Sequence, residues 1–173
     1  MPFSLYDATV ASFQQGLTAL DAILGRAQTH FQQQGTPLAD IVGARLAPDM
    51  LPFSFQIVSA AHHSMGALSG ARLGLFKPPS PPDAPDFAGL QALIAQAGQG
   101  LGQLGRDEVN ALEGSDVVFE LGERRLPFLA EDFLLSFSLP NFYFHTTTAY
   151  DLLRLHGMPL AKRDYLGRLR LKG

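Results

Sequence analysis

Cysteine and tryptophan are both absent from this chain of 173 residues. Without cysteine the chain can form no disulfide, no thiolate nucleophile and no cysteine-ligated zinc site, and a reducing compartment is expected. Lys and Arg are dense only at the extreme C-terminus, and the formal net charge is −3. Because nucleic-acid binding needs a basic surface, we expect no nucleic-acid partner.

Long apolar runs are also lacking. No stretch of about eighteen consecutive apolar residues occurs, so no membrane span is expected. The opening residues, MPFSLYDATV, lack the basic segment and apolar run of a signal peptide, which predicts a cytoplasmic protein. What the chain does contain is 46% apolar residues, including 13 Phe. This composition is typical of a globular protein, and residues 1–173 are expected to form a single domain.

The first long segment has a regular apolar stripe. Apolar residues recur there at alternating steps of four and three, the period of a helix with one buried face. They are Tyr6, Val10, Phe13, Leu17, Leu20, Leu24, Ala27 and Phe31. The pattern predicts a helix from Leu5 to Gln34, capped by Ser4 and stopped by Gly35.

Three further helices are predicted, over residues 52–76, 87–104 and 131–156. A proline-broken crossover with one helical turn near 38–42 precedes the second helix, and a stiff proline-rich linker, KPPSPPDAP, precedes the third. Alternating segments at 117–121 and 124–128 predict a small β-hairpin before the fourth helix. The expected fold is therefore all-α: an antiparallel four-helix bundle with a long crossover after helix one and this hairpin.

Two features of these helices bear on assembly and on the site. The small residues of helix two, such as Ala60, Gly66 and Gly70, predict a tight contact, either within the bundle or at a dimer seam. Pro140 interrupts helix four and is expected to expose carbonyl groups that Asn141 or water satisfies. The pattern leaves open whether the basic tail from residue 160 docks on the bundle or frays.

The histidines of helices two and four suggest a site. Asn141 and His145 are four residues apart and share a helix face, close enough to bind one ion together. His62 or His63, which are adjacent on helix two, would be the third ligand; His63 lies on the side with more small residues. With imidazole ligands, the metal would be zinc, nickel or iron. Residue chemistry alone favours the alternative, a hydrogen-bonded polar network inside the bundle, because a neutral Asn is a poor metal ligand.

Four separated motifs resemble a known family. The chain is similar to an uncharacterised bacterial domain-of-unknown-function family within the DinB/YfiT-like superfamily, whose members are described as metalloenzymes. The motifs that carry this resemblance are SLYDATV, RLAPDM, LPNFYFHTTTAYDLLRLHG and KRDYLG, between Ser4 and Gly167. The resemblance implies a four-helix bundle, often a homodimer, in which three histidines hold a divalent metal.

The resemblance also assigns ligand positions. By position, His145 matches the second histidine of the superfamily's H-x-x-x-H motif, Asn141 stands where the first is expected, and His63 matches the ligand on helix two. The implied site thus retains two imidazoles and replaces one. The zinc or nickel enzyme, a thiol transferase or hydrolase, is then one hypothesis. The favoured hypothesis is a homodimeric bundle with a degenerate site that binds a small molecule; a stress-associated interaction protein is the third.

Overall fold

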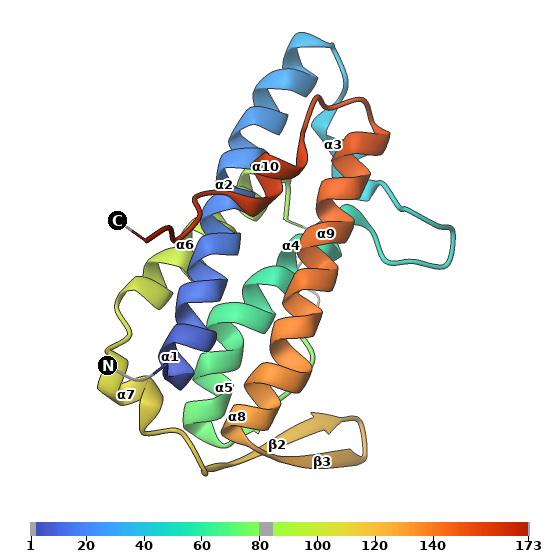
Figure 1. Ribbon diagram of the computed structural model, residues 1–173. Helices are drawn as coiled ribbons and strands as arrows, with labels where there is room; N and C mark the ends of the chain where they lie inside the picture. Colours follow the sequence, from blue (N-terminus) through green and yellow to red (C-terminus); the bar gives the residue numbers. More distant parts are fainter. Residues whose placement is uncertain (1–2, 80–84, 173) are drawn as a thin grey trace.

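The computed structural model describes residues 3–79 and 85–172, which form a mostly helical protein with a small sheet at one end (Figure 1). Four long helical stretches lie side by side. They are α2 (Val10–Gln33); α4 (Phe53–Ala61), η1 (His62–Gly66) and α5 (Ala67–Leu73) in succession; α6 (Phe87–Gly102); and α8 (Ala130–Asp132), η2 (Phe133–Ser138) and α9 (Leu139–Leu155) in succession. Both α2 and α4 pack against α6 and α9, so the four stretches enclose one core.

Shorter elements connect and cover these stretches. Four short helices are α1 (Leu5–Ala8), α3 (Leu38–Gly43), α7 (Arg106–Asn110) and α10 (Lys162–Leu166), and the strands are β1 (Leu75–Phe76), β2 (Asp116–Leu121) and β3 (Arg124–Leu129). The predicted hairpin is confirmed as β2 and β3, which pair antiparallel. The predicted helical turn after the first crossover is confirmed as α3.

The apolar stripe of the first helix is confirmed. All its members except Tyr6 are buried in the core. Ser4 caps α1 as predicted, since its side chain accepts a hydrogen bond from the Asp7 amide. The predicted single helix is, however, interrupted at Thr9, whose Oγ1 donates to the Leu5 carbonyl 2.6 Å away. This local bond competes with regular helical pairing and separates α1 from α2.

The predicted end of helix two at residue 76 is wrong. The helix ends at Leu73 because Gly74 adopts a left-handed conformation, with φ of +69°. Leu75 and Phe76 then form β1, which pairs parallel with Val118 and Phe119 of β2. The sheet therefore has three strands in the order β1-β2-β3 instead of the two of a hairpin.

Small residues of helix two serve contacts inside the chain. Ala60, Ala67 and Ala71 are buried in the core. A side chain on Gly70 would lie 2.8 Å from the Phe76 ring, so this glycine lets β1 return closely against α5. These small residues therefore make the tight contact that the sequence predicts for helix two, and they make it within the chain.

Two π-helical turns interrupt the second and fourth helical stretches. One is η1, which contains His62 and His63, and the other is η2, which leads into α9 just before Pro140. A π turn widens the helix by one residue and is frequent at functional sites. Asn141 Nδ2 donates to the Phe137 carbonyl at 2.7 Å, so the expectation that Asn141 satisfies a carbonyl near Pro140 is confirmed.

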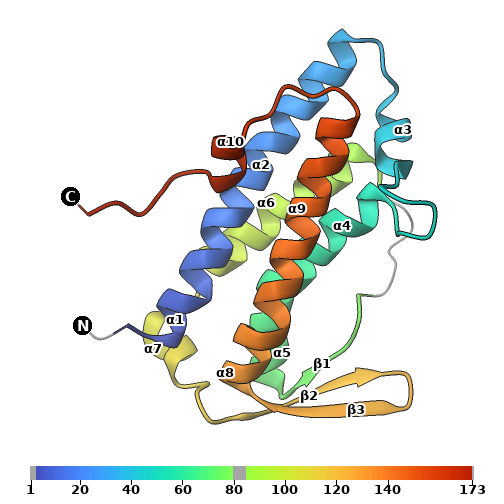
Figure 2. The same cartoon turned by 45° about the vertical axis from the view of Figure 1, so that its right-hand side comes forward.

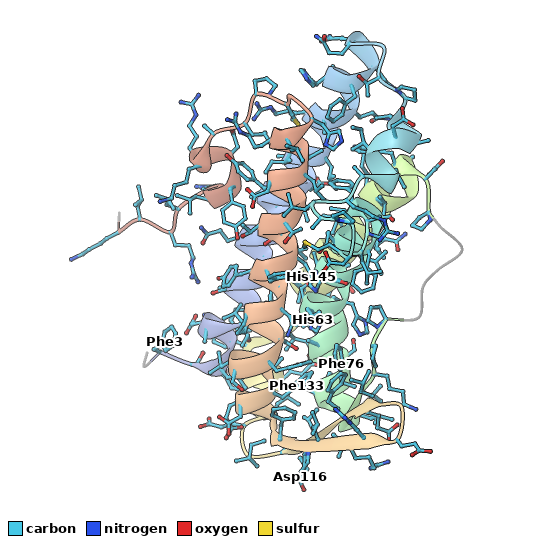
Figure 3. The ribbon with its side chains drawn as sticks, turned by 90° about the vertical axis from the view of Figure 1, so that its right-hand side faces the viewer. Phe3, His63, Phe76, Asp116, Phe133 and His145 are labelled. Atoms are coloured by element: carbon cyan, nitrogen blue, oxygen red, sulfur yellow. The ribbon has the colours of Figure 1, made fainter. Side chains whose placement is uncertain are left out.

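A phenylalanine cluster joins the sheet to the helices. The Phe76 ring lies 5.0 Å from Phe133 and 5.9 Å from Phe119 between centroids, and Phe137 lies 4.8 Å from Phe119. Figure 3 shows Phe76 and Phe133 between the sheet and the two buried histidines. Because edge-to-face aromatic contacts add to apolar burial, the cluster anchors a sheet that would be marginal by itself.

The C-terminal tail docks on the helices, which settles the alternative that the sequence left open. α10 lies across α2, as Figure 2 shows, and an ion pair of 2.7 Å joins Arg26 to Asp164. Thr147 Oγ1 on α9 donates to the Tyr165 hydroxyl at 2.9 Å. The tail thus contacts two of the four long stretches.

The predicted stiff linker falls partly on residues 80–84, which lie outside the described residues. Through residues 3–79 and 85–172, no helix combines the length and the apolar character that crossing a bilayer requires.

Candidate functional site

Two buried histidines from different helical stretches face one another. His63 comes from η1 and His145 from the middle of α9, and their ring centroids are 5.8 Å apart with planes inclined by 16° (Figure 3). Only 7% of His63 and 9% of His145 is exposed. The structure therefore brings together two of the predicted site residues, 82 positions apart in the sequence.

His145 is held in one tautomer by a glutamine. Its Nδ1 lies 2.8 Å from Gln56 Oε1 on α4, and Gln56 is itself buried. Gln56 Nε2 donates to the Leu51 carbonyl at 2.9 Å, which fixes the orientation of the amide. Since an amide oxygen only accepts, Nδ1 carries the proton and Nε2 carries the lone pair. His145 is thus oriented to accept a hydrogen bond, or to bind a ligand, through Nε2.

His63 has an unsatisfied nitrogen. Its Nδ1 is buried and has no hydrogen-bond partner among the residues that the structure describes. Ser59, one helical turn earlier, has a buried hydroxyl in the same condition. Because buried polar atoms are nearly always satisfied, these two atoms need a further partner, which a water molecule or a ligand would supply.

Both imidazoles are neutral at pH 7. Burial, helped by the nearby His145 and His62, lowers the pKa of His63 to about 3. Burial lowers the pKa of His145 to about 4. Desolvation penalises the charged imidazolium, so each ring keeps a lone pair. The pair can accept hydrogen bonds but cannot offer positive charge to an anion.

The surroundings of the pair are aromatic. Phe55 and Phe144 lie 5.9 and 5.3 Å from the His145 ring, and Phe76 and Phe137 each lie 5.5 Å from the His63 ring. These side chains supply apolar surface and no charge. The site is therefore an aromatic, uncharged environment around two hydrogen-bond acceptors.

His62, the predicted substitute for His63, has its hydrogen bond outside this pair, although its ring lies 5.7 Å from the His63 ring between centroids. Its Nε2 lies 2.7 Å from the Lys77 carbonyl, and its ring stacks on Phe76 at 4.4 Å. Burial lowers its pKa, while the Lys77 carbonyl partly offsets that effect. The hydrogen bond that Nε2 donates to the Lys77 carbonyl ties His62 to the segment just after β1. His62 therefore has a structural partner, whereas His63 has a nitrogen left for a ligand.

Asn141 turns its amide nitrogen toward its own helix. Nδ2 donates to the Phe137 carbonyl, one turn earlier, and the residue is half-buried. In an amide, this leaves the oxygen for any contact with a ligand. The third predicted site residue is thus engaged in a backbone contact that does not require a metal.

The side chains present do not form a complete ligand set for zinc or nickel. Across the described ranges, no group of three or more His, Cys, Asp and Glu residues is placed to hold an ion. Catalytic zinc sites use three strong protein ligands, whereas this site offers two imidazoles and an amide, which is a weak ligand. The orientation of His145 by Gln56 nevertheless resembles how metal-binding histidines are held.

Gln56 and Ser59 are the site residues that the sequence prediction missed. They precede His63 by seven and four positions, so all three share one helix face. Polar residues at this spacing inside an otherwise apolar helix could have indicated that Gln56 and Ser59 lie beside His63. Nothing in the sequence indicated that His145, 89 positions after Gln56, would be its partner.

Comparison with known proteins places this site in context. The structure is similar to the crystal structure of a DinB family member protein from Shewanella denitrificans, with a TM-score of 0.79 and 26% sequence identity. The match covers 98% of this chain and 95% of that chain. No curated protein gives a significant match. Residues 5–166 match the family described as "Domain of unknown function (DUF1993)". The chain therefore belongs to this DinB-like family of unknown function.

Proposed function

We propose that this protein binds a small uncharged molecule at the site around His63 and His145. The observation that carries the proposal is the unpartnered, buried Nδ1 of His63 beside a His145 that Gln56 holds with its Nε2 lone pair available. Two fixed acceptors in an aromatic environment suit a ligand that donates hydrogen bonds. Asn141, through its amide oxygen, is the third proposed contact.

Charge excludes other classes of ligand from this proposal. An anion would need a protonated imidazole, yet burial lowers the pKa of His63 to about 3 and that of His145 to about 4. An organic cation would need a carboxylate to compensate its charge in a desolvated site. A neutral alcohol, phenol or amide needs neither, and its apolar part would contact Phe55, Phe76 and Phe137.

The test uses phenol and benzamide as probes in a thermal-shift and calorimetric titration. The expected result is saturable binding that His63→Phe removes, since Phe keeps the ring volume and lacks the acceptor nitrogen. His30→Phe is the matched control, because His30 lies at the end of α2 and outside the site. If neither probe binds, or if both variants bind them equally, the proposal is wrong.

The second candidate function is a divalent-metal-dependent enzyme of DinB type, a thiol transferase or hydrolase. The hydrogen bond from His145 Nδ1 to Gln56 favours it, because this contact presents Nε2 as metal-binding histidines do. His63, His145 and Asn141 would hold zinc or nickel. Metal analysis of untagged protein distinguishes the candidates: stoichiometric metal that disappears in His145→Ala supports the enzyme, and no metal together with no thermal shift in added zinc or nickel opposes it.

We also propose an antiparallel four-helix-bundle arrangement for the long stretches and a homodimer in solution. The dimer surface that we propose is the exposed apolar face of α9. Phe144 is 56% exposed there and Leu155 is 65% exposed. Light scattering should give twice the protomer mass of 18.7 kDa. A monomer mass would refute the dimer and leave the ligand proposal standing.

A further inference from the structure

A cavity of about 250 Å³ lies between α2, α9 and the C-terminal tail. None of the five histidines lines it, so it is separate from the candidate site. Its walls come from two of the motifs noted in the sequence: Phe142, Tyr143 and Thr146 on α9, and Tyr165 and Leu166 of KRDYLG. Figure 2 shows α10 lying across α2.

The tail that covers this cavity is fixed by specific contacts. Gln15 Nε2 on α2 donates to the Leu166 carbonyl at 2.9 Å, and Arg26 pairs with Asp164. Gly167 lies so close to α2 that a side chain there would approach the Ala19 Cβ to 2.9 Å. The covering segment is thus a built part of the fold, held on both sides of Tyr165.

The floor of the cavity is apolar and rigid. Leu20, Ile23 and the fully buried Phe142 contribute to its lining. The Phe142 ring lies against the α2 backbone at Gly16, where an added Cβ would be 2.6 Å from the ring. Phe142 also meets Phe13 edge to face, with centroids 5.1 Å apart. This packing presents a fixed apolar surface to the cavity.

The rim of the cavity offers hydrogen-bond donors and one positive charge. The guanidinium of Arg170 makes two long hydrogen bonds, 3.4 Å to the Asp7 carbonyl and 3.5 Å to Ser12 Oγ. The Asp7 carboxylate is engaged by Arg106 at 2.7 Å. Within residues 3–79 and 85–172, no carboxylate lies within ion-pair distance of Arg170.

The Tyr165 hydroxyl is the second donor at this rim. It accepts a hydrogen bond from Thr147 Oγ1 at 2.9 Å and lies 3.3 Å from Thr146 Oγ1. Because Thr147 occupies one acceptor position, the phenolic hydrogen of Tyr165 remains for Thr146 or for a ligand. The cavity therefore combines an apolar floor with a guanidinium and a hydroxyl donor at its edge.

We propose that this cavity is a second binding site, and that it takes a small aromatic carboxylate. A dry cavity of roughly 150 Å³ already accommodates benzene, so the present volume holds one ring and a short acidic group. The ring would lie on Phe142 and Ile23, and the carboxylate would accept from Arg170 and Tyr165. An arginine with no carboxylate partner among the described residues is well suited to a carboxylate ligand, which it binds through paired hydrogen bonds.

The test is a fluorine NMR titration of the whole chain with 4-fluorobenzoate, with methyl 4-fluorobenzoate as the neutral analogue, which donates no hydrogen bond to the histidine pair. We expect saturable binding of the acid that is about tenfold tighter than that of the ester, since a charge-assisted hydrogen bond is lost. Arg170→Gln should weaken the acid to the level of the ester. Arg168→Gln, the same change on the same exposed tail but outside the lining, should leave the affinity unaltered.

Two further measurements keep the outcome decisive. Ser12→Phe, which introduces a ring from the α2 side of the cavity, should abolish binding while circular dichroism shows an unchanged helical fold. Amide chemical shifts should change near Gly16, Thr146 and Gly167. The proposal is overturned if 4-fluorobenzoate does not bind, if both arginine variants bind it like the wild type, or if the shifts gather at His63. None of these outcomes affects the function proposed for the histidine pair.

Discussion

Mild acid should destabilise this protein through its two buried histidines. Burial holds the pKa of His63 at about 3 and that of His145 at about 4 in the folded chain, against an ordinary value of 6.5. Below pH 6.5 the unfolded chain therefore binds more protons than the folded chain. The free energy of unfolding falls as the pH drops below 6.5, and the loss stops growing only when the pH passes the folded values.

The size of the effect follows from these values. A pH of 5 is about 1.5 units below the ordinary pKa of histidine, so each imidazole is protonated in the unfolded chain. This protonation favours unfolding by about 2 kcal/mol per histidine. The two together remove about 4 kcal/mol, a large part of the roughly 5–15 kcal/mol that stabilises a typical domain. Burial also lowers the pKa of His62, which acts in the same direction.

Carboxylates affect the free energy of unfolding in a lower pH range than the histidines do. The Arg106 guanidinium lowers the pKa of Asp7 to about 2. A lowered carboxyl pKa contributes stability that is complete above the ordinary value near 4 and is lost only as the pH falls toward the folded value. Acidification from pH 7 to pH 5 therefore tests the histidines with little contribution from Asp7.

Urea denaturation followed by far-ultraviolet circular dichroism provides the measurement, with EDTA present so that no metal competes with protons. We expect the free energy of unfolding to fall by about 4 kcal/mol between pH 7 and pH 5 in the wild type. His63→Phe should show about half that fall, and Asp7→Asn should show all of it. A fall below about 1 kcal/mol, or an undiminished fall in His63→Phe, would refute the reasoning.

Three other substitutions test separate parts of the structure. Gly167→Ala should lower the free energy of unfolding in urea by about 1–3 kcal/mol, because φ of +61° and the contact with Ala19 both disfavour a side chain. Gly35→Ala is the control, since Gly35 has a φ of +68° but open space around it, and it should lower that free energy less. Equal losses in the two variants would contradict this account. Asn141→His should add a third imidazole one turn before His145, so that zinc raises the melting temperature more than in the wild type; no added shift would count against a shared site. Phe142→Ala should cost about 3–5 kcal/mol by opening a cavity beside Gly16, and a cost under about 1 kcal/mol would contradict the packing described.

The helices were predictable because their signals are local. The stripe from Val10 to Phe31 needs only the helical period, and the cap at Ser4 needs only a short polar side chain before an apolar run. The DinB-like family was likewise visible in short motifs. Each of these features depends on residues within a few positions of one another.

The errors arose where distant segments decide the structure. Strand β1 has only two residues, and it exists because β2, more than forty positions later, pairs with it. Gly74 was a local signal for the end of the helix, but the apolar residues after it continued the helical pattern. The π turns cannot be read from residue types, since they depend on how neighbouring helices pack.

In the site, too, features set by neighbouring residues were predictable and contacts between distant segments were not. The sequence singled out His63 and His145, and the structure brings them together, but their roles as ligands for a metal or a small molecule stay predictions. The role of Gln56 could not be inferred, because its partner lies on another helix. The docking of Tyr165 on Thr147 was equally hidden, since a tail of basic and apolar residues is compatible with docking and with fraying.

The two π turns have a consequence for comparing relatives of this protein. Because each turn holds one residue more than a regular helix would, losing a single residue within 62–66 or 133–138 would restore the ordinary helical register. In a regular helix the same deletion would rotate one half relative to the other by about 100°, but here removing the extra residue of the π turn leaves the flanking helix faces in phase. In an alignment, a one-residue gap inside either helix would therefore mark a relative that lacks the π turn and keeps the same packing on both sides of it.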